Sequence, residues 1–246
     1  MQTKYSLALD FHENTKSLII SDNFDPKPHY KIYPNTKTIP LNPNYAPITP
    51  NTNSDFLSTL LSRKSTRAFS QDSISLENLS NLLTLSFGVR NNEEHPTSRT
   101  YPSAGGRFPI EVYVAVLRSD DMEKGIYHYN VKDNTIEFLK PGNYSDELQN
   151  FYKNQEEIIP TGYPCLILFS MVFNRTMQKY GERGYRFILL DAGHMGQNLY
   201  LVATHLGLGA VALGAGSGND EQLDNIIGLV SGEENIFYSF AIGVPQ

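Results

Sequence analysis

Two arginines four residues apart open a short polar segment that could bind an anion. Arg63 and Arg67 lie on either side of Lys64 and Ser65. At the end of a helix this spacing would bring both guanidinium groups to one face. Guanidinium groups match the geometry of phosphate oxygens, and the Ser65 hydroxyl adds a hydrogen-bond donor. A solvated, charged helix end has the same spacing, so the segment alone is only a weak indication of phosphate binding.

A second segment has the composition needed to contact a flat ligand. Pro102, Ser103, Ala104 and Gly105 lie in a loop expected from residue 88 to residue 109. Small side chains let the backbone approach a ring closely, and Ser103 can donate a hydrogen bond to it. A plain surface loop would have the same composition.

Lys179 and Tyr180 are neighbours that could carry out proton transfer. A lysine can act as a base when burial lowers its pKa, and an adjacent tyrosine can take part in the same transfer. Most such pairs are ordinary surface residues, so composition alone does not assign this role.

A glycine-rich stretch from residue 207 to residue 218 is similar in composition to a nucleotide-binding loop. A dinucleotide-binding fingerprint requires a strand, then glycines, then a helix. Here the glycines close a helix and lead into a strand, so we reject that interpretation. Leu213, Gly214 and Gly216 could still bring backbone groups against the edge of a ring.

These segments must be positioned by helices and strands. The apolar periodicity of the sequence predicts an α+β protein with a mixed central sheet and one long buried helix. Ser75 is suited to cap the start of a helix over 76–87, and Gly88 to end it. The helix over 187–206 is apolar almost all round, so we expect it to be covered on every side. A further helix is expected from residue 54, with strands over 110–117, 126–129, 135–139, 164–172, 210–214 and 237–244.

The N-terminal part is expected to form an arm. Residues 21–50 hold seven of the fourteen prolines, which favour extended backbone. Apolar side chains such as Tyr30, Tyr33 and Leu41 favour an arm docked on a surface, which could belong to a second subunit, over a disordered leader. We therefore predict an arm over 1–53 and one domain over 54–246.

Composition narrows the class of protein. The formal net charge of −6 argues against general binding of nucleic acid, and no Lys or Arg follows Arg186. The single cysteine, Cys165, lies in an apolar run and is expected to be an inert core thiol. The chain shows no signal peptide and no apolar stretch that could span a membrane, so a cytoplasmic location is expected.

Taken together, these segments resemble the nitroreductase superfamily, and within it the SagB-type azoline dehydrogenase branch. The motifs are Pro-Ser-Ala-Gly at 102–105, Lys179-Tyr180 followed by Arg-Gly-Tyr-Arg at 183–186, and Leu-Leu-Asp-Ala-Gly-His-Met-Gly-Gln-Asn-Leu at 189–199. The N-terminal segments 11–16 and 31–34 are also similar to this branch. The resemblance covers nearly the whole chain.

This resemblance implies a nitroreductase-like fold, a domain-entwined homodimer and FMN bound at the subunit interface. Lys179 and Tyr180 match the pair regarded as catalytic. The residues that would bind FMN are Arg63, Lys64, Ser65, Arg67, Pro102, Ser103, Ala104, Gly105, Leu213, Gly214 and Gly216. The sequence departs from ordinary nitroreductases in having no basic residue near its C-terminus.

The activity implied is oxidation of a thiazoline or oxazoline ring to the aromatic azole in a peptide natural product, with Lys179 or Tyr180 accepting a proton. An azoline-containing peptide would be the substrate, and a cyclodehydratase a possible partner. One alternative is an NAD(P)H-dependent nitro- or quinone reductase on the same fold. Another is a non-catalytic flavin-binding subunit of a peptide-modifying complex.

Overall fold

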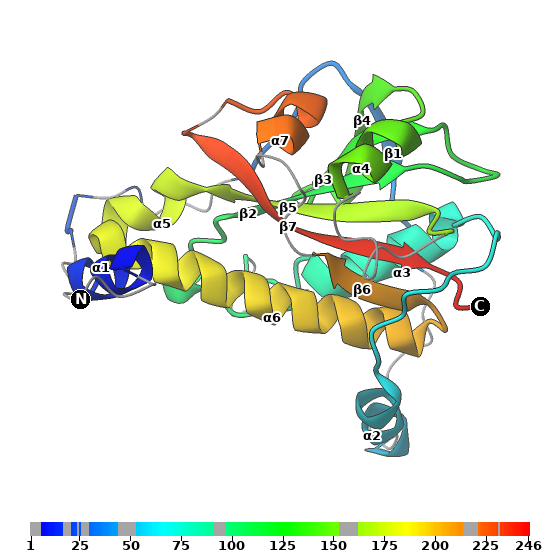
Figure 1. The fold of residues 1–246 in the computed structure, drawn as a ribbon, viewed down its shortest axis with the longest axis horizontal. Helices are drawn as coiled ribbons and strands as arrows, with labels where there is room; N and C mark the ends of the chain where they lie inside the picture. Colours follow the sequence, from blue (N-terminus) through cyan, green and yellow to red (C-terminus); the bar gives the residue numbers. More distant parts are fainter. Residues whose placement is uncertain are drawn as a thin grey trace.

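The computed structural model describes residues 6–16, 21–23, 25, 30–43, 53–90, 97–152, 162–213, 221–230 and 232–246. Its centre is a seven-stranded sheet of order β1-β4-β3-β2-β5-β7-β6 (Figure 1). The strands are β1 (Lys37–Pro40), β2 (Ile110–Val116), β3 (Gly125–Asn130), β4 (Thr135–Pro141), β5 (Cys165–Val172), β6 (Gly209–Leu213) and β7 (Glu234–Gly243). All neighbouring strands pair antiparallel, so the predicted mixed character is limited to a parallel bridge between Ser65 and Ala210 at the β6 edge.

Helices cover both faces of the sheet (Figure 1). One face packs against α3 (Leu76–Phe87) and α6 (Gly184–His205), and the other against α4 (Ser145–Tyr152) and α7 (Glu221–Ile227). The interior strand β5 is apolar except for Ser170, because alternate residues enter two different cores. Its Ile167 and Phe169 lie in the α3–α6 core, while Leu166 and Leu168 lie in the other.

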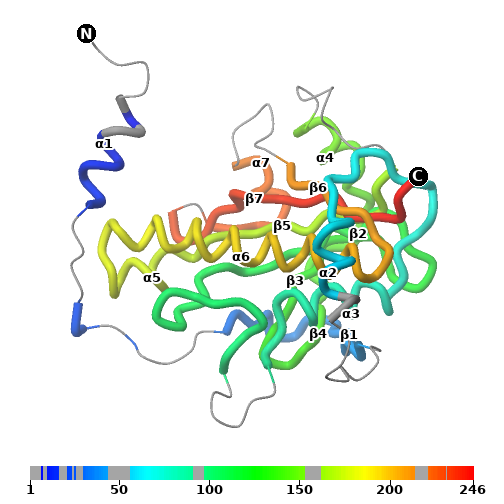
Figure 2. The backbone as a smooth tube through the Cα atoms, turned by 90° about the horizontal axis from the view of Figure 1, so that it is seen from below, coloured from blue at the N-terminus to red at the C-terminus, as the bar shows by residue number. Residues whose placement is uncertain are grey.

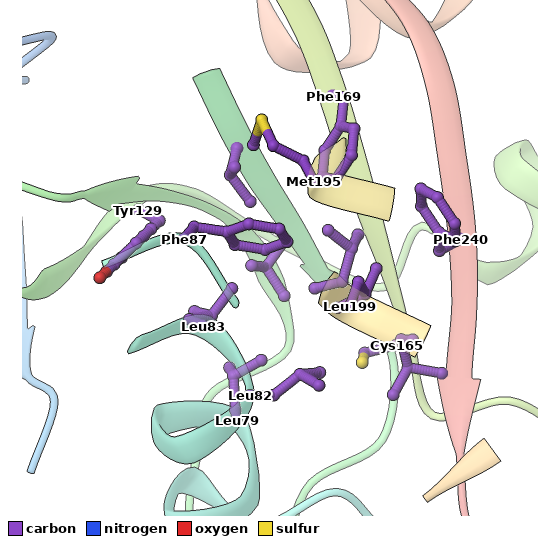
Figure 3. Close-up of a cluster of buried hydrophobic side chains, with 14 of the residues drawn as sticks. Leu79, Leu82, Leu83, Phe87, Tyr129, Cys165, Phe169, Met195, Leu199 and Phe240 are labelled. Atoms are coloured by element: carbon purple, nitrogen blue, oxygen red, sulfur yellow. The ribbon is translucent and has the colours of Figure 1, made fainter. Parts of the chain in front are cut away.

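The larger core forms where α3 and α6 meet the sheet. Figure 3 shows Leu79, Leu82, Leu83 and Phe87 of α3 facing Met195 and Leu199 of α6, with strand residues Phe169 and Phe240 beside them. As predicted, the Ser75 hydroxyl caps α3, accepting from Asn78 N at 3.1 Å. Cys165 is also in this core, and burial raises the pKa of its thiol to about 12. The predicted position of Cys165 in the core is confirmed.

Helix α6 is longer than predicted and only partly buried in one chain. It begins at Gly184, three residues before the predicted start, and ends at His205. Ile188 and Met195 are fully buried, but Leu189 and Leu190 are 41% and 59% exposed on the opposite face. The expectation that the helix is covered on every side is therefore wrong for the single chain. Within one chain, the sheet buries only one side of this helix.

The described part of the arm docks on the chain's own sheet. Strand β1 pairs with β4, and Leu41 N donates to Asn134 O at 3.0 Å. Lys31 Nζ pairs with Glu234, and Tyr33 N donates to Glu137 Oε2 at 3.1 Å.

The short helix α1 (Ser6–Asn14), which was not predicted, projects away from the body of the molecule, and only its C-terminal end lies near the start of α6 (Figure 2). Arg186 Nε donates to Thr15 Oγ1 at 2.6 Å, and Arg183 Nη1 to Lys16 O at 2.6 Å. These contacts fasten the chain that follows α1 to the N-terminal end of α6.

Candidate functional site

The cationic segment, residues 63–67, is extended and lies beside the edge strand β6. Helix α2 (Asn53–Ser62) ends one residue before Arg63, as the backbone turns to run along the sheet. Thr66 N donates to Ala210 O at 2.9 Å. The expectation that a helical end groups the two guanidinium groups is therefore wrong. In an extended chain alternate residues point to the same side, but residues four positions apart are separated by about 13 Å, so Arg63 and Arg67 are further apart than on a helix.

Tyr200 of α6 contacts two residues of the cationic segment. The Arg63 guanidinium lies over the Tyr200 ring, 5.3 Å from its centroid. Ser65 Oγ is 3.3 Å from Tyr200 Oη, and this oxygen also accepts from Ala212 N at 2.7 Å. Tyr200 could not be recognised as a site residue from sequence patterns, because its contacts join three segments that are distant along the chain.

The charge of the cationic segment is not neutralised locally. Lys64 and Arg67 are exposed, and Arg63 is half-buried. Within the residues that the structure describes, no carboxylate forms an ion pair with any of the three. Their donors are therefore available to an anion, and guanidinium groups favour a phosphate.

The structure brings Lys179 and Tyr180 beside the 102–105 loop. Both lie in the last turn of α5 (Phe173–Tyr180), a helix that the sequence analysis did not predict. A Cβ placed on Gly105 would lie 2.3 Å from Tyr180 Oη and 3.1 Å from Lys179 Nζ. Gly105 has φ 61°, a conformation that glycine adopts without strain. Two segments selected separately from the sequence therefore form one group.

Asp191, on the buried face of α6, holds the beginning of this loop. Its Oδ2 accepts from Ser103 Oγ at 2.5 Å, and its Oδ1 accepts from Ala104 N at 3.3 Å. Burial raises the pKa of the Asp191 carboxyl, although the hydrogen bonds from Ser103 and Ala104 act in the opposite direction. Asp191 lies within the motif at 189–199, but no local pattern predicts its contact with the loop.

A buried charged network holds the end of the same loop. Arg175 of α5 donates from Nη1 to Phe108 O at 3.0 Å and pairs through Nη2 with Glu111 at 2.5 Å. His128 lies between two carboxylates, with Nε2 3.0 Å from Glu111 and Nδ1 2.8 Å from Glu137. Burial alone would raise the pKa of Glu111, but Arg175 and His128 hold it well below its ordinary range. Charge balance therefore keeps this network stable inside the protein.

The two groups occupy different turns of α6. Asp191 holds the 102–105 loop and Tyr200 the cationic segment, nine residues further on, which corresponds to roughly 14 Å along the helix axis. Among the described residues of one chain, no hydrogen bond or ion pair joins residues 63–67 to residues 102–105. The folded chain therefore presents two half-sites.

The remaining predicted contacts lie at or beyond the end of β6. Leu213 is in β6, and its side chain is buried in the core shared with α7, so only its backbone could face a ligand. Gly214 and Gly216 lie outside the described residues. His194 is exposed on α6 rather than enclosed in a core.

Two other kinds of feature are absent from the described residues. None of their helices combines the length and apolar character needed to cross a bilayer. They also hold no cluster of three or more His, Cys, Asp or Glu side chains suited to a metal ion.

Comparisons with known proteins agree on one family. The profile of the nitroreductase family matches residues 60–244. A nitroreductase-family protein of Methanocaldococcus jannaschii, MJ1384, is 33% identical over 156 residues, which are 63% of this chain and 76% of that protein. The microcin B17-processing protein McbC of Escherichia coli is 31% identical over 45% of this chain. The trifolitoxin-processing protein TfxB of Rhizobium leguminosarum is 32% identical over 45% of this chain. The matched region spans 42% of McbC and 30% of TfxB.

Solved structures share the fold. A nitroreductase-like protein from Anabaena variabilis superposes with a TM-score of 0.79 and 26% identity, over 98% of this chain and 47% of that one. One from Ralstonia eutropha gives a TM-score of 0.69 and 27% identity, over 94% and 99% of the two chains. A chain of the E. coli microcin synthetase McbBCD complex gives 0.67 with 20% identity, over 98% and 92%. These similarities support the fold predicted from the sequence.

Proposed function

Because the chain belongs to the nitroreductase family, we propose that it is an FMN-dependent dehydrogenase that oxidises thiazoline or oxazoline rings to azoles in a peptide natural product. Two relatives process the peptides microcin B17 and trifolitoxin, which supports a peptide substrate. The observation that carries the proposal is the placement of Lys179 Nζ and Tyr180 Oη at the loop of Gly105. This placement puts two groups capable of proton transfer beside a backbone open to a flat ligand.

The free cations of residues 63–67 suit the phosphate of FMN. Arg63, Lys64 and Arg67 would bind its oxygens, with the Ser65 hydroxyl as a further donor, and no described carboxylate competes with them. The 102–105 loop would contact the ring, and so would the backbone at Leu213 and the segment with Gly214 and Gly216. A bound flavin supplies the two-electron acceptor that azoline oxidation requires.

We further propose a homodimer with FMN between the subunits. Helix α2 extends from the body of the molecule (Figure 1), and its Phe56, Leu57 and Leu61 are 60%, 56% and 84% exposed. Exposed apolar groups of this size favour association. A homodimer would also allow the cationic segment of one subunit to face the 102–105 loop of the other, so that two separated half-sites form one site.

The chemistry assigned to this chain is removal of one proton from the azoline ring. The carbon next to the carbonyl loses a proton to Lys179 or Tyr180, while the adjacent ring carbon loses a hydride to the acceptor. The ring thereby loses two hydrogen atoms, one as a proton and one as a hydride, and becomes aromatic. A bound FMN would supply the two-electron acceptor, with dioxygen as the final oxidant. The other member of the pair orients the base or stabilises negative charge on the carbonyl oxygen.

The proposal is tested with purified protein, FMN and a synthetic peptide that bears one thiazoline. We expect yellow protein and a product that has lost two hydrogens by mass spectrometry. Lys179→Ala and Tyr180→Phe should lower turnover by about 10²–10⁴-fold while FMN stays bound. Arg67→Ala should instead weaken FMN binding. Wild-type turnover in both pair variants, or protein that stays colourless with excess FMN, would contradict the proposal.

A second candidate is an NAD(P)H-dependent nitro- or quinone reductase. The match to MJ1384 covers more of both chains than the matches to the peptide-processing proteins, and this favours it. An NADPH:FMN oxidoreductase from Vibrio harveyi shares the fold, with a TM-score of 0.54 and 17% identity. Rapid anaerobic bleaching of the bound flavin by NADPH, without thiazoline oxidation, would select this candidate.

A further inference from the structure

The carboxylate of Asp191 has an arrangement that neither catalysis nor flavin binding explains. It is the only acidic side chain in α6, and it is 3% exposed. No described Lys, Arg or His forms an ion pair with it. His194 acts on this carboxyl through its charge but forms no ion pair with it. A buried carboxylate without a paired cation is costly, so its hydrogen bonds must account for most of its place in the fold. Asp191 accepts both hydrogen bonds from the 102–105 loop.

The single proton of the Ser103 hydroxyl is used within the protein. The hydroxyl donates it to Asp191 Oδ2 at 2.5 Å. Its oxygen accepts from Phe108 N at 2.8 Å, and this hydrogen bond links the two ends of the turn over 103–108. The Ser103 proton is therefore not available to a ligand in this arrangement. Gly105 N–H, in contrast, has no acceptor among the described residues, and Gly105 is exposed.

We infer that Asp191 is a positioning residue, which holds Ser103 and Ala104 so that Gly105 stays against Tyr180 and Lys179. This inference rests on the proposed function, because it assigns Asp191 to the support of that site. The bond to Ser103 fixes one end of the loop, and the bond from Arg175 to Phe108 O fixes the other. The donor that the loop offers to a ligand is then the backbone of Gly105, while Ser103 serves the loop itself.

Asp191→Asn is the direct test, because an amide keeps the size of the carboxylate but retains only one acceptor oxygen. Asp224→Asn is the matched control. Asp224 is 2% exposed and likewise accepts one side-chain and one backbone hydrogen bond, from Asn235 Nδ2 and Ile236 N, both at 2.6 Å. It lies in α7, on the opposite face of the sheet from α6 (Figure 1). Both substitutions should lower the stability of the protein, but only Asp191→Asn should affect the 102–105 loop.

The first measurement is amide hydrogen exchange in protein without FMN. In Asp191→Asn, the peptide covering 102–108 should exchange at least about tenfold faster than in the wild type, and in Asp224→Asn it should not. Ser103→Ala removes the same bond from the other side and should match Asp191→Asn. Ser103→Thr keeps the hydroxyl and should restore slow exchange. Unchanged exchange in both Asp191→Asn and Ser103→Ala would overturn the inference.

The second measurement is turnover of the thiazoline peptide with saturating FMN. Misplacement of the loop should lower kcat by about 10–10²-fold and change KM by less than about threefold. Ser103→Thr should recover most of kcat. Equal losses of kcat in Asp191→Asn and Asp224→Asn would reduce Asp191 to a general stability role and overturn the inference. If the wild-type protein does not oxidise the peptide, the proposed function fails, whereas the exchange result still decides whether Asp191 holds the loop.

Discussion

Gly105 and Tyr180 lie so close that a Cβ on Gly105 would be 2.3 Å from Tyr180 Oη. Gly105→Ala should therefore displace either the loop or the tyrosine. Because small displacements of a catalytic group are costly, we expect thiazoline oxidation to fall by about 10²-fold. Steady-state turnover with saturating FMN measures the effect.

Gly106→Ala is the control for this change. Gly106 has φ 64°, so alanine suffers the same backbone strain there, but its Cβ would meet nothing within 4 Å. The two variants should lose similar stability in urea unfolding, and only Gly105→Ala should lose turnover. Equal turnover in both variants would show that contact with Tyr180 does not matter.

Tyr200→Phe should weaken both the fold and the binding of FMN. The change removes the oxygen that accepts from Ala212 N and lies beside Ser65 Oγ. One lost hydrogen bond corresponds to about 0.5–1.5 kcal/mol, so we expect the FMN Kd to rise about 2–10-fold, as measured by fluorescence titration. Tyr152→Phe removes a hydroxyl contact to Ser239 in the other core. It should cost similar stability without changing the FMN Kd.

His128 should make stability depend on pH. Burial alone would lower the pKa of this imidazole, but its hydrogen bonds to Glu111 and Glu137 raise it above the ordinary 6.5. A raised pKa in the folded state gives stability that is complete below about pH 6.5 and is lost as the pH rises through the folded pKa. Urea unfolding from about pH 6 to pH 9 should therefore show a decline in the wild type.

The variant His128→Gln should be less stable at the acidic end by about 3–5 kcal/mol, because it removes the cation between two buried carboxylates and leaves only Glu111 with another, Arg175. Its stability should also vary less with pH over this range. Exposed His194→Gln serves as the control and should follow the wild-type curve. Parallel curves for the wild type and His128→Gln would contradict the assignment of a charged His128.

The apolar face of α2 should determine the oligomeric state. Leu57→Ser combined with Leu61→Ser removes two exposed leucines, each worth roughly 1.5–3 kcal/mol if a partner buries it. Analytical ultracentrifugation should show a dimer for the wild type and a monomer for the double variant, which should also lose FMN. Val230→Ser is the control, since Val230 is 63% exposed and lies outside α2. A wild-type monomer that binds FMN would contradict the proposed dimer.

Much of the fold followed from local patterns. The helix over 76–87 was predicted with its caps because Ser75, Glu77 and Gly88 act on backbone groups within one turn. The strand over 164–172 was predicted to within one residue because its apolar run is buried on both faces. Helix α5 was missed although Phe173, Met177 and Tyr180 follow helical spacing, because the pattern extends over only eight residues directly after a strand. Helix α2 ends before Arg63, where the chain turns to pair with β6.

By itself, the sequence determined the fold class, the core position of Cys165 and the segments that hold the candidate chemistry, since each depends on residue type and short-range spacing. The tertiary structure decided which of these segments meet. Lys179 and Tyr180 reach Gly105 because α5 lies against the 102–105 loop. Asp191 contacts that loop and Tyr200 contacts the cationic segment because α6 spans both half-sites. Such contacts join residues up to 135 positions apart, and no local periodicity encodes a hydrogen bond across that separation.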